Sequence, residues 1–93
     1  MKMYINGNWT SGSSEMDVLN PYTGKPFDTV PSATVEDVEM AIKSAGRGAS
    51  AMRAMSAFER YEILMRTVDI IKDRRQDLGE TITREEGKVI SEG

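Results

Sequence analysis

The 93-residue chain contains no cysteine and no histidine. Without cysteine it can form no disulfide, no thiolate metal site and no thiol nucleophile, and without histidine it lacks the commonest general base and metal ligand. No apolar run is long enough for a signal peptide or a membrane span, because residues 1–5 lead directly into Asn6 and Gly7. We therefore expect a cytoplasmic protein with no membrane partner.

The chain also lacks the excess of positive charge that nucleic-acid binding requires. Its net charge is -3, and the one basic pair, Arg74 and Arg75, stands between Asp73 and Asp77. With 39% hydrophobic and 29% charged residues the chain is typical of a soluble globular protein. A chain of this size can bury only about 60–65% of its unfolded surface, so we expect a thin core.

Residues 1–31 show the pattern of short strands joined by turns. Asn6 and Gly7 readily take positive φ at both central positions of a type I′ turn, which predicts a hairpin between residues 4–5 and 8–9. Met16 and Val18 alternate with a polar residue in a second predicted strand, which Asn20 and Pro21 end.

A returning strand is predicted over residues 27–30, between Pro26 and Pro31. Asp17 and Asp28 have no partner that the sequence identifies, so we interpret them as surface residues.

Residues 34–87 show helical periodicity. Thr34 and Asp37 predict the start of a first helix. Its apolar stripe consists of Val35, Val38, Ile42, Ala45, Ala49 and Met52. Because Gly46 and Gly48 each cost about 1 kcal/mol relative to alanine in a helix, we expect this helix to end near Ala45 and residues 46–52 to be loosely wound.

Ser56 and Glu59 form a capping box that predicts a second helix extending to about Arg75. Its apolar face consists of Tyr61, Leu64, Met65, Val68 and Ile71, with Ile70 beside it. A third helical segment is predicted over residues 76–86, with Gly87 as a left-handed cap.

No residue of this chain qualifies as a catalytic, cofactor-binding or metal-binding site. Glu85 and Glu86 point about 100° apart on a helix, so they cannot share a target, and with Lys88 they are more typical of a solvated helix end. Residues 46–48 hold two of the three glycines of a dinucleotide fingerprint, but they follow a helical stripe instead of a strand. The methionines, at helical spacings, indicate core filling in preference to a binding groove.

The order of these motifs resembles the amino-terminal segment of the NAD(P)-dependent aldehyde dehydrogenase superfamily, over residues 3–93. Three motifs typical of the family lie in the first third of the chain: Ile-Asn-Gly-x-Trp at residues 5–9, Asn-Pro-x-x-Gly at 20–24 and Val-Pro-x-Ala at 30–33. Three more follow: Ala-(Val/Ile) at 41–42, Ser-x-x-Glu-Arg at 56–60 and Glu-x-Gly-Lys at 85–88. The chain departs from it at Ala49 and Met52, where phenylalanine and tryptophan are usual, and at Gly48, where alanine is usual. Residues 83–88 are similar to those of semialdehyde-oxidising members.

The resemblance implies an α/β enzyme in which a cysteine attacks the aldehyde, hydride passes to NAD or NADP, and a glutamate activates water. Residues 1–93 would be an incomplete part of the cofactor-binding domain. By themselves they form an α+β piece, with strands and turns over 1–31 and two or three amphipathic helices over 34–87. The resemblance implies that this piece serves as scaffold, and that alone it is inactive and binds no cofactor. Its partner would be the remainder of the dehydrogenase, which would be a homo-oligomer at full length.

Two alternatives to this interpretation stay open at the level of sequence. The chain could be a self-standing helical protein-interaction module, although such a module has no use for the strand motifs before residue 31. It could also be the product of a truncated reading frame, with no function of its own.

Overall fold

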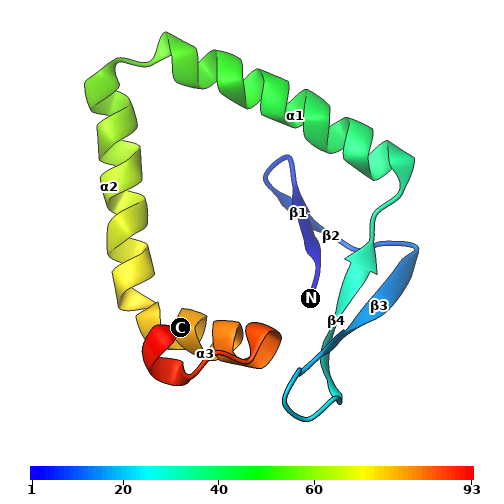
Figure 1. Ribbon diagram of the computed structural model, residues 1–93. Coiled ribbons are helices and arrows are strands. Elements are labelled where there is room, and N and C mark those ends of the chain that lie inside the picture. The colour runs from blue at the N-terminus through cyan, green and yellow to red at the C-terminus, as the bar shows by residue number, and fades with distance from the viewer. The chain divides into compact units, whose positions relative to one another are not determined.

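The structure, a computed structural model, describes all of residues 1–93 as two small antiparallel sheets followed by helices (Figure 1). The elements are β1 (Met3–Ile5), β2 (Asn8–Thr10), β3 (Ser14–Leu19), β4 (Pro26–Ser32), α1 (Val35–Ala54), α2 (Ala57–Asp73), α3 (Arg75–Glu86) and the short 3₁₀ helix η1 (Ile90–Glu92). They form two compact units, one made of Met1–Val18 with Asp28–Ala54 and the other of Leu19–Phe27 with Met55–Gly93. This α+β composition is the one that the sequence predicts.

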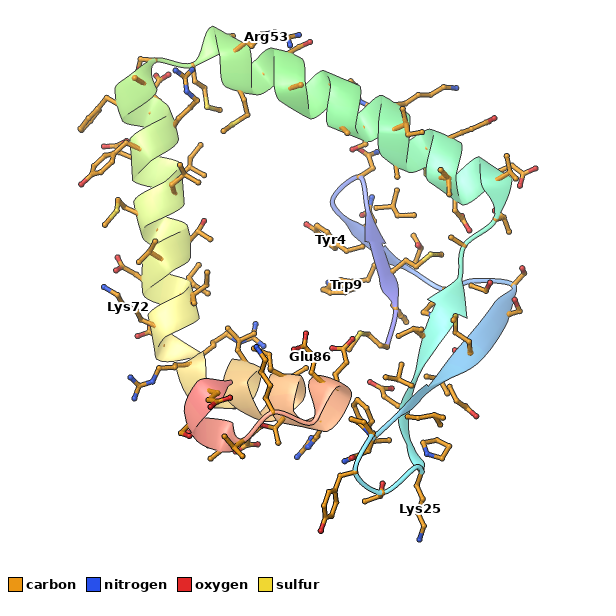
Figure 2. All side chains as sticks on the ribbon, viewed as in Figure 1. Tyr4, Trp9, Lys25, Arg53, Lys72 and Glu86 are labelled. Atoms are coloured by element: carbon orange, nitrogen blue, oxygen red, sulfur yellow. The ribbon has the colours of Figure 1, made fainter.

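The β1–β2 hairpin confirms the predicted type I′ turn. Ile5 pairs with Asn8, and the two residues between them have positive φ, 52° at Asn6 and 78° at Gly7. Tyr4 pairs with Trp9 across the strands, and their ring centroids lie 5.0 Å apart (Figure 2). This aromatic contact stabilises the hairpin, although both side chains remain exposed.

The β3–β4 pair is longer than predicted, because Pro26 and Pro31 lie within β4 instead of bounding it. Both strands are edges of a two-stranded sheet, where a proline need not donate a ladder hydrogen bond. The connecting turn depends on Asn20, whose side-chain Oδ1 accepts hydrogen bonds from the backbone N–H groups of Tyr22 and Thr23 at 2.9 and 3.3 Å.

Helix α1 begins as predicted and ends nine residues later than predicted. Thr34 and Asp37 cap it reciprocally: the Thr34 N–H donates to Asp37 Oδ2 at 2.9 Å, and the Asp37 N–H donates to Thr34 Oγ1 at 3.2 Å. The expected end near Ala45 is wrong, because the helix continues through both glycines to Ala54. Continuing a helix adds one hydrogen bond per residue, whereas a new helix requires costly nucleation, so two glycines do not interrupt it.

Helix α2 carries the predicted capping box, with Ser56 Oγ accepting from the Glu59 N–H and Glu59 Oε2 accepting from the Ser56 N–H. It ends two residues before the predicted Arg75, and Arg74 alone separates it from α3. Gly87 caps α3 in the left-handed conformation with φ 75°, as predicted. The sequence analysis did not anticipate η1, which packs against α3.

The expected thin core does not form within these 93 residues. No hydrophobic side chain is buried, and the accessible surface is 7544 Å². A compact monomer of 10.3 kDa would expose about 5,400 Å². The interpretation of the methionines as core filling is therefore wrong for this chain by itself, since Met40, Met52 and Met65 are all at least 36% exposed.

Candidate functional site

The glycines of residues 46–48 belong to a helix and not to a phosphate-binding turn. Arg47, between them, donates from Nη2 to Asn6 Oδ1 at 3.0 Å, and Ser44 Oγ lies 3.2 Å from the same oxygen. These contacts attach the tip of the β1–β2 hairpin to α1. The side chain of Arg47 is thus used in a contact between α1 and the hairpin.

Asp28 has partners that the sequence did not identify. Its Oδ1 accepts from the Thr29 N–H at 2.7 Å and lies 3.4 Å from the amino group of Met1, which also donates to the Thr29 carbonyl at 3.1 Å. The Thr29 hydrogen bond, helped by the Met1 charge, holds the pKa of Asp28 below its usual value. Asp28 therefore anchors the start of the chain to β4, whereas Asp17 is exposed.

Of the two carboxylates at the end of α3, that of Glu86 pairs with Lys88. Glu86 Oε2 lies 3.8 Å from Lys88 Nζ, and both side chains are more than half exposed. No group of three or more aspartate or glutamate residues is placed to hold a metal ion. The main packing constraint here is on Gly87, where a Cβ would lie 3.1 Å from Cγ of Pro21.

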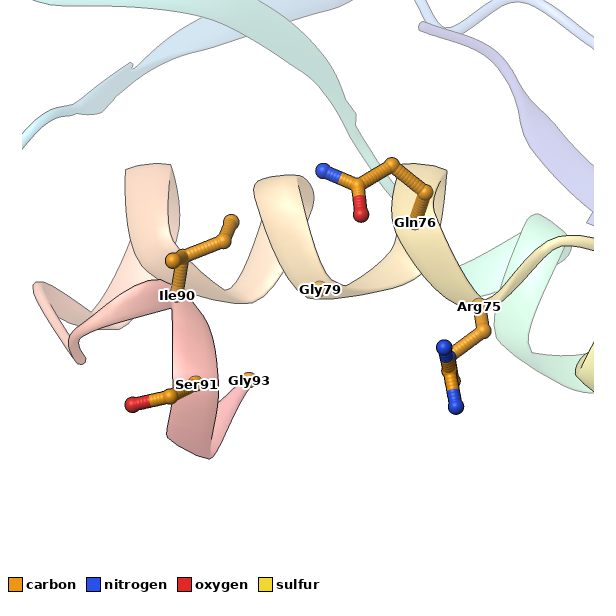
Figure 3. Close-up of a pocket in the computed structure, with 6 residues that line it drawn as sticks. All are labelled: Arg75, Gln76, Gly79, Ile90, Ser91 and Gly93. Atoms are coloured by element: carbon orange, nitrogen blue, oxygen red, sulfur yellow. The ribbon is translucent and has the colours of Figure 1, made fainter.

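One open cavity of about 340 Å³ lies between α3 and η1 (Figure 3). It is lined by Arg75, Gln76, Gly79, Ile90, Ser91 and Gly93. A guanidinium, an amide and a hydroxyl can form hydrogen bonds, but none of the three is a carboxylate or thiol that could act as base or nucleophile.

An apolar side of α2 is exposed. We call it the α2 apolar face, and it consists of Phe58, Tyr61, Leu64, Met65, Val68 and Ile71. The ring centroids of Phe58 and Tyr61 lie 6.1 Å apart, so the two rings form one continuous apolar surface. This face carries the sequence-predicted residues plus Phe58, while Ile70, predicted beside the face, is also exposed.

The profile of the aldehyde dehydrogenase family matches residues 9–93. The chain belongs to this family. The backbone also matches two crystal structures of point mutants of betaine aldehyde dehydrogenase from Staphylococcus aureus, each in complex with NAD+ and with a chemically modified cysteine. In both matches the TM-score is 0.88, the sequence identity is 30%, and the aligned region covers 98% of this chain but 19% of the other.

These matches confirm the resemblance that the motifs indicate and identify the chain as an amino-terminal segment of an aldehyde dehydrogenase. The chain spans about a fifth of the length of the structures it matches. None of its own helices is long and apolar enough to cross a membrane. The family's usual aromatic positions, here Ala49 and Met52, lie on α1, so the departure alters a helix surface and not a turn.

Proposed function

We propose that the chain contributes scaffold to an enzyme that oxidises an aldehyde to a carboxylate with NAD or NADP. The observation that carries this proposal is the family match over residues 9–93, together with a backbone match that covers nearly all of this chain. In this reaction a hydride leaves the aldehyde carbon for the nicotinamide, and water supplies the second carboxylate oxygen with release of two protons. The similarity of residues 83–88 to semialdehyde-oxidising members favours a semialdehyde substrate.

The 93 residues alone are not expected to catalyse this reaction. Covalent aldehyde oxidation in this family requires a thiol nucleophile, and the chain contains no cysteine. It also lacks a glycine-rich strand-to-helix turn that could hold the pyrophosphate of NAD or NADP. The whole enzyme, in this proposal, binds the nicotinamide cofactor with residues outside this segment.

Within that enzyme, residues 1–93 would form an incomplete part of the cofactor-binding domain. The segment's partner would be the remainder of the dehydrogenase, and the complete enzyme would be a cytoplasmic homo-oligomer. The neighbours crystallised with NAD+ support a nicotinamide cofactor.

A second candidate function is that of a self-standing interaction module, and the exposed apolar face of α2 favours it. The two β-sheets weigh against this candidate, because a helix-only binder does not need them. A module would also have to be stable alone, whereas no hydrophobic side chain of this chain is buried.

A segment exchange tests the scaffold function. In S. aureus betaine aldehyde dehydrogenase, the region that matches this chain is replaced by the 93 residues, with a scrambled 93-residue sequence as control. We expect the chimera to be soluble and to reduce NAD+ with betaine aldehyde, while the scrambled control is insoluble or inactive. An insoluble chimera would contradict the scaffold function.

The isolated chain provides the complementary measurement. Mixed with a panel of aldehydes and NAD or NADP, it should give no reduction above buffer. Turnover that persists through repurification would show that the chain has chemistry of its own.

A further inference from the structure

The tip of the β1–β2 hairpin brings the side-chain amide of Asn6 against two donors on α1 (Figure 1). Arg47 Nη2 donates to Asn6 Oδ1 at 3.0 Å, and Ser44 Oγ donates to the same oxygen at 3.2 Å. Because a guanidinium can only donate, the atom that Arg47 contacts is the amide oxygen and not the nitrogen. Both donors withdraw electrons from Cγ of Asn6, and that of Arg47 carries a positive charge.

The residue after Asn6 is the one that least hinders attack on this Cγ. The backbone nitrogen of the next residue can close a five-membered ring on an asparagine Cγ, and a side chain there would crowd the nitrogen, but Gly7 has none. A Cβ built at Gly7 would meet no atom within 4 Å, so the turn has room to rearrange. Both residues are exposed to water, and the two strands of the hairpin have only three residues each, so the turn can open readily.

The other two asparagines of the chain lack this combination. Asn8 is followed by Trp9, whose side chain crowds the backbone nitrogen. Asn20 is followed by Pro21, whose nitrogen has no hydrogen to lose. Neither amide oxygen accepts from a charged donor, since Asn20 Oδ1 accepts from the backbone N–H groups that follow it.

We propose that Asn6 is a site of spontaneous deamidation, and that Arg47 and Ser44 accelerate the reaction and direct it to aspartate. The Gly7 nitrogen forms a bond to Cγ, and the negative charge that develops on Oδ1 is stabilised by the two donors. The bond from Cγ to Nδ2 then breaks. Nδ2 leaves as ammonia, taking up the proton that the Gly7 nitrogen gives up, and a cyclic imide remains.

Water opens this ring at one of its two carbonyl carbons. Attack at Cγ breaks its bond to the Gly7 nitrogen, which regains a proton, and leaves an aspartate. Attack at the backbone carbonyl carbon leaves an isoaspartate, which lengthens the main chain by one atom. The charged donor Arg47 faces the oxygen on Cγ, whereas the backbone oxygen accepts from the neutral Nδ2 of Asn8 at 3.2 Å, so aspartate is favoured. The new carboxylate keeps Arg47 as a charge-assisted partner, so the hairpin tip stays attached to α1.

Incubation of the 93-residue chain in mildly alkaline buffer tests this proposal, and the test is independent of the scaffold function. Peptide mass spectrometry locates each amide that becomes an acid, and electron-based fragmentation distinguishes aspartate from isoaspartate. Arg47→Ala and Ser44→Ala remove the two donors. Arg53→Ala is the matched control, because it removes the same charge from α1 at a residue whose guanidinium contacts Ser50 instead of the hairpin.

We expect the native chain to convert Asn6 well before Asn8 or Asn20, with aspartate as the main product. Arg47→Ala should slow the conversion at least about threefold and raise the share of isoaspartate, because a donor to a developing oxyanion is lost. Arg53→Ala should match the native chain. Arg47→Lys, which keeps a charged donor, should react at a rate closer to the native one, which a merely structural role of Arg47 would not explain. In concentrated urea all the variants should react alike.

Two kinds of result would overturn the proposal. Conversion of Asn6 that is absent, or no faster than that of Asn8, would show that the hairpin tip is not a deamidation site. Equal or faster conversion in Arg47→Ala, or differences between variants that persist in urea, would show that the contact with α1 does not promote the reaction.

Discussion

Replacing Ser56 with alanine should shorten or destabilise α2 by a predictable amount. The substitution removes the hydroxyl that accepts from the Glu59 N–H at 3.1 Å, and it leaves that N–H to water. Loss of a serine cap typically costs about 1 kcal/mol. In a chain with no buried hydrophobic side chain, this cost shifts the helix–coil equilibrium of α2 by roughly fivefold.

Circular dichroism at 222 nm of the isolated chain, followed during a urea titration, measures this shift. Glu59→Gln is the matched control, because glutamine preserves the return hydrogen bond to the Ser56 N–H. It should lose much less helicity than Ser56→Ala, and Ser13→Ala, in an exposed loop, should lose none. Unchanged helicity in Ser56→Ala would refute the reasoning, since the cap would then contribute nothing to where α2 begins.

Three further substitutions test individual contacts. Gly87→Ala should destabilise the end of α3 by about 1–2 kcal/mol, because alanine is disfavoured at φ 75° and its Cβ would lie 3.1 Å from Pro21. Faster hydrogen exchange of the α3 amides would measure this destabilisation. Gly12→Ala places a Cβ 2.9 Å from Cβ of Pro31, so we expect faster proteolysis of the β3–β4 region, whereas no change would mean that the loop relaxes freely. Because folding lowers the pKa of Asp28, its contribution to stability is present above pH 3.8 and is lost as the pH falls through the lower folded-state value. When the pH is lowered from roughly 5 to 2, the free energy of unfolding of Asp28→Asn should therefore fall by less than that of the native chain. Equal losses would show that the Asp28 carboxylate does not stabilise the fold.

The features that the sequence predicted correctly are encoded within a few neighbouring residues. Asn6 and Gly7 determine a turn by their own backbone preferences, and Ser56 and Glu59 satisfy each other's N–H groups three residues apart. Gly87 likewise ends α3 by its own tolerance of positive φ. No distant partner is needed for any of these, so one sequence suffices to find them.

The features that were missed or wrong depend on distant residues or on sums over many residues. Asn6 and Arg47 are 41 positions apart, and Met1 and Asp28 are 27 apart, and no periodicity relates such pairs. The end of α1 was misplaced because the local cost of Gly46 was weighed without the hydrogen bonds that a continuing helix adds. No catalytic, cofactor-binding or metal-binding residue was predicted from the sequence, and the exposure of the α2 apolar face could not be predicted because exposure depends on which surfaces pack against the helix.

Exposure of the α2 apolar face leaves a large favourable free energy unrealised in this chain. At about 25 cal/mol per Å², covering an apolar area on the order of 500 Å² would contribute roughly 12 kcal/mol before entropic costs. The net stability of a whole domain is about 5–15 kcal/mol, so this one contact is comparable with everything that holds an ordinary domain together. Local caps worth about 1 kcal/mol each select where the helices begin, but they cannot replace a missing core. Local sequence therefore selects where the helices begin and end, whereas burial of apolar surface would have to supply most of the free energy that keeps the segment folded.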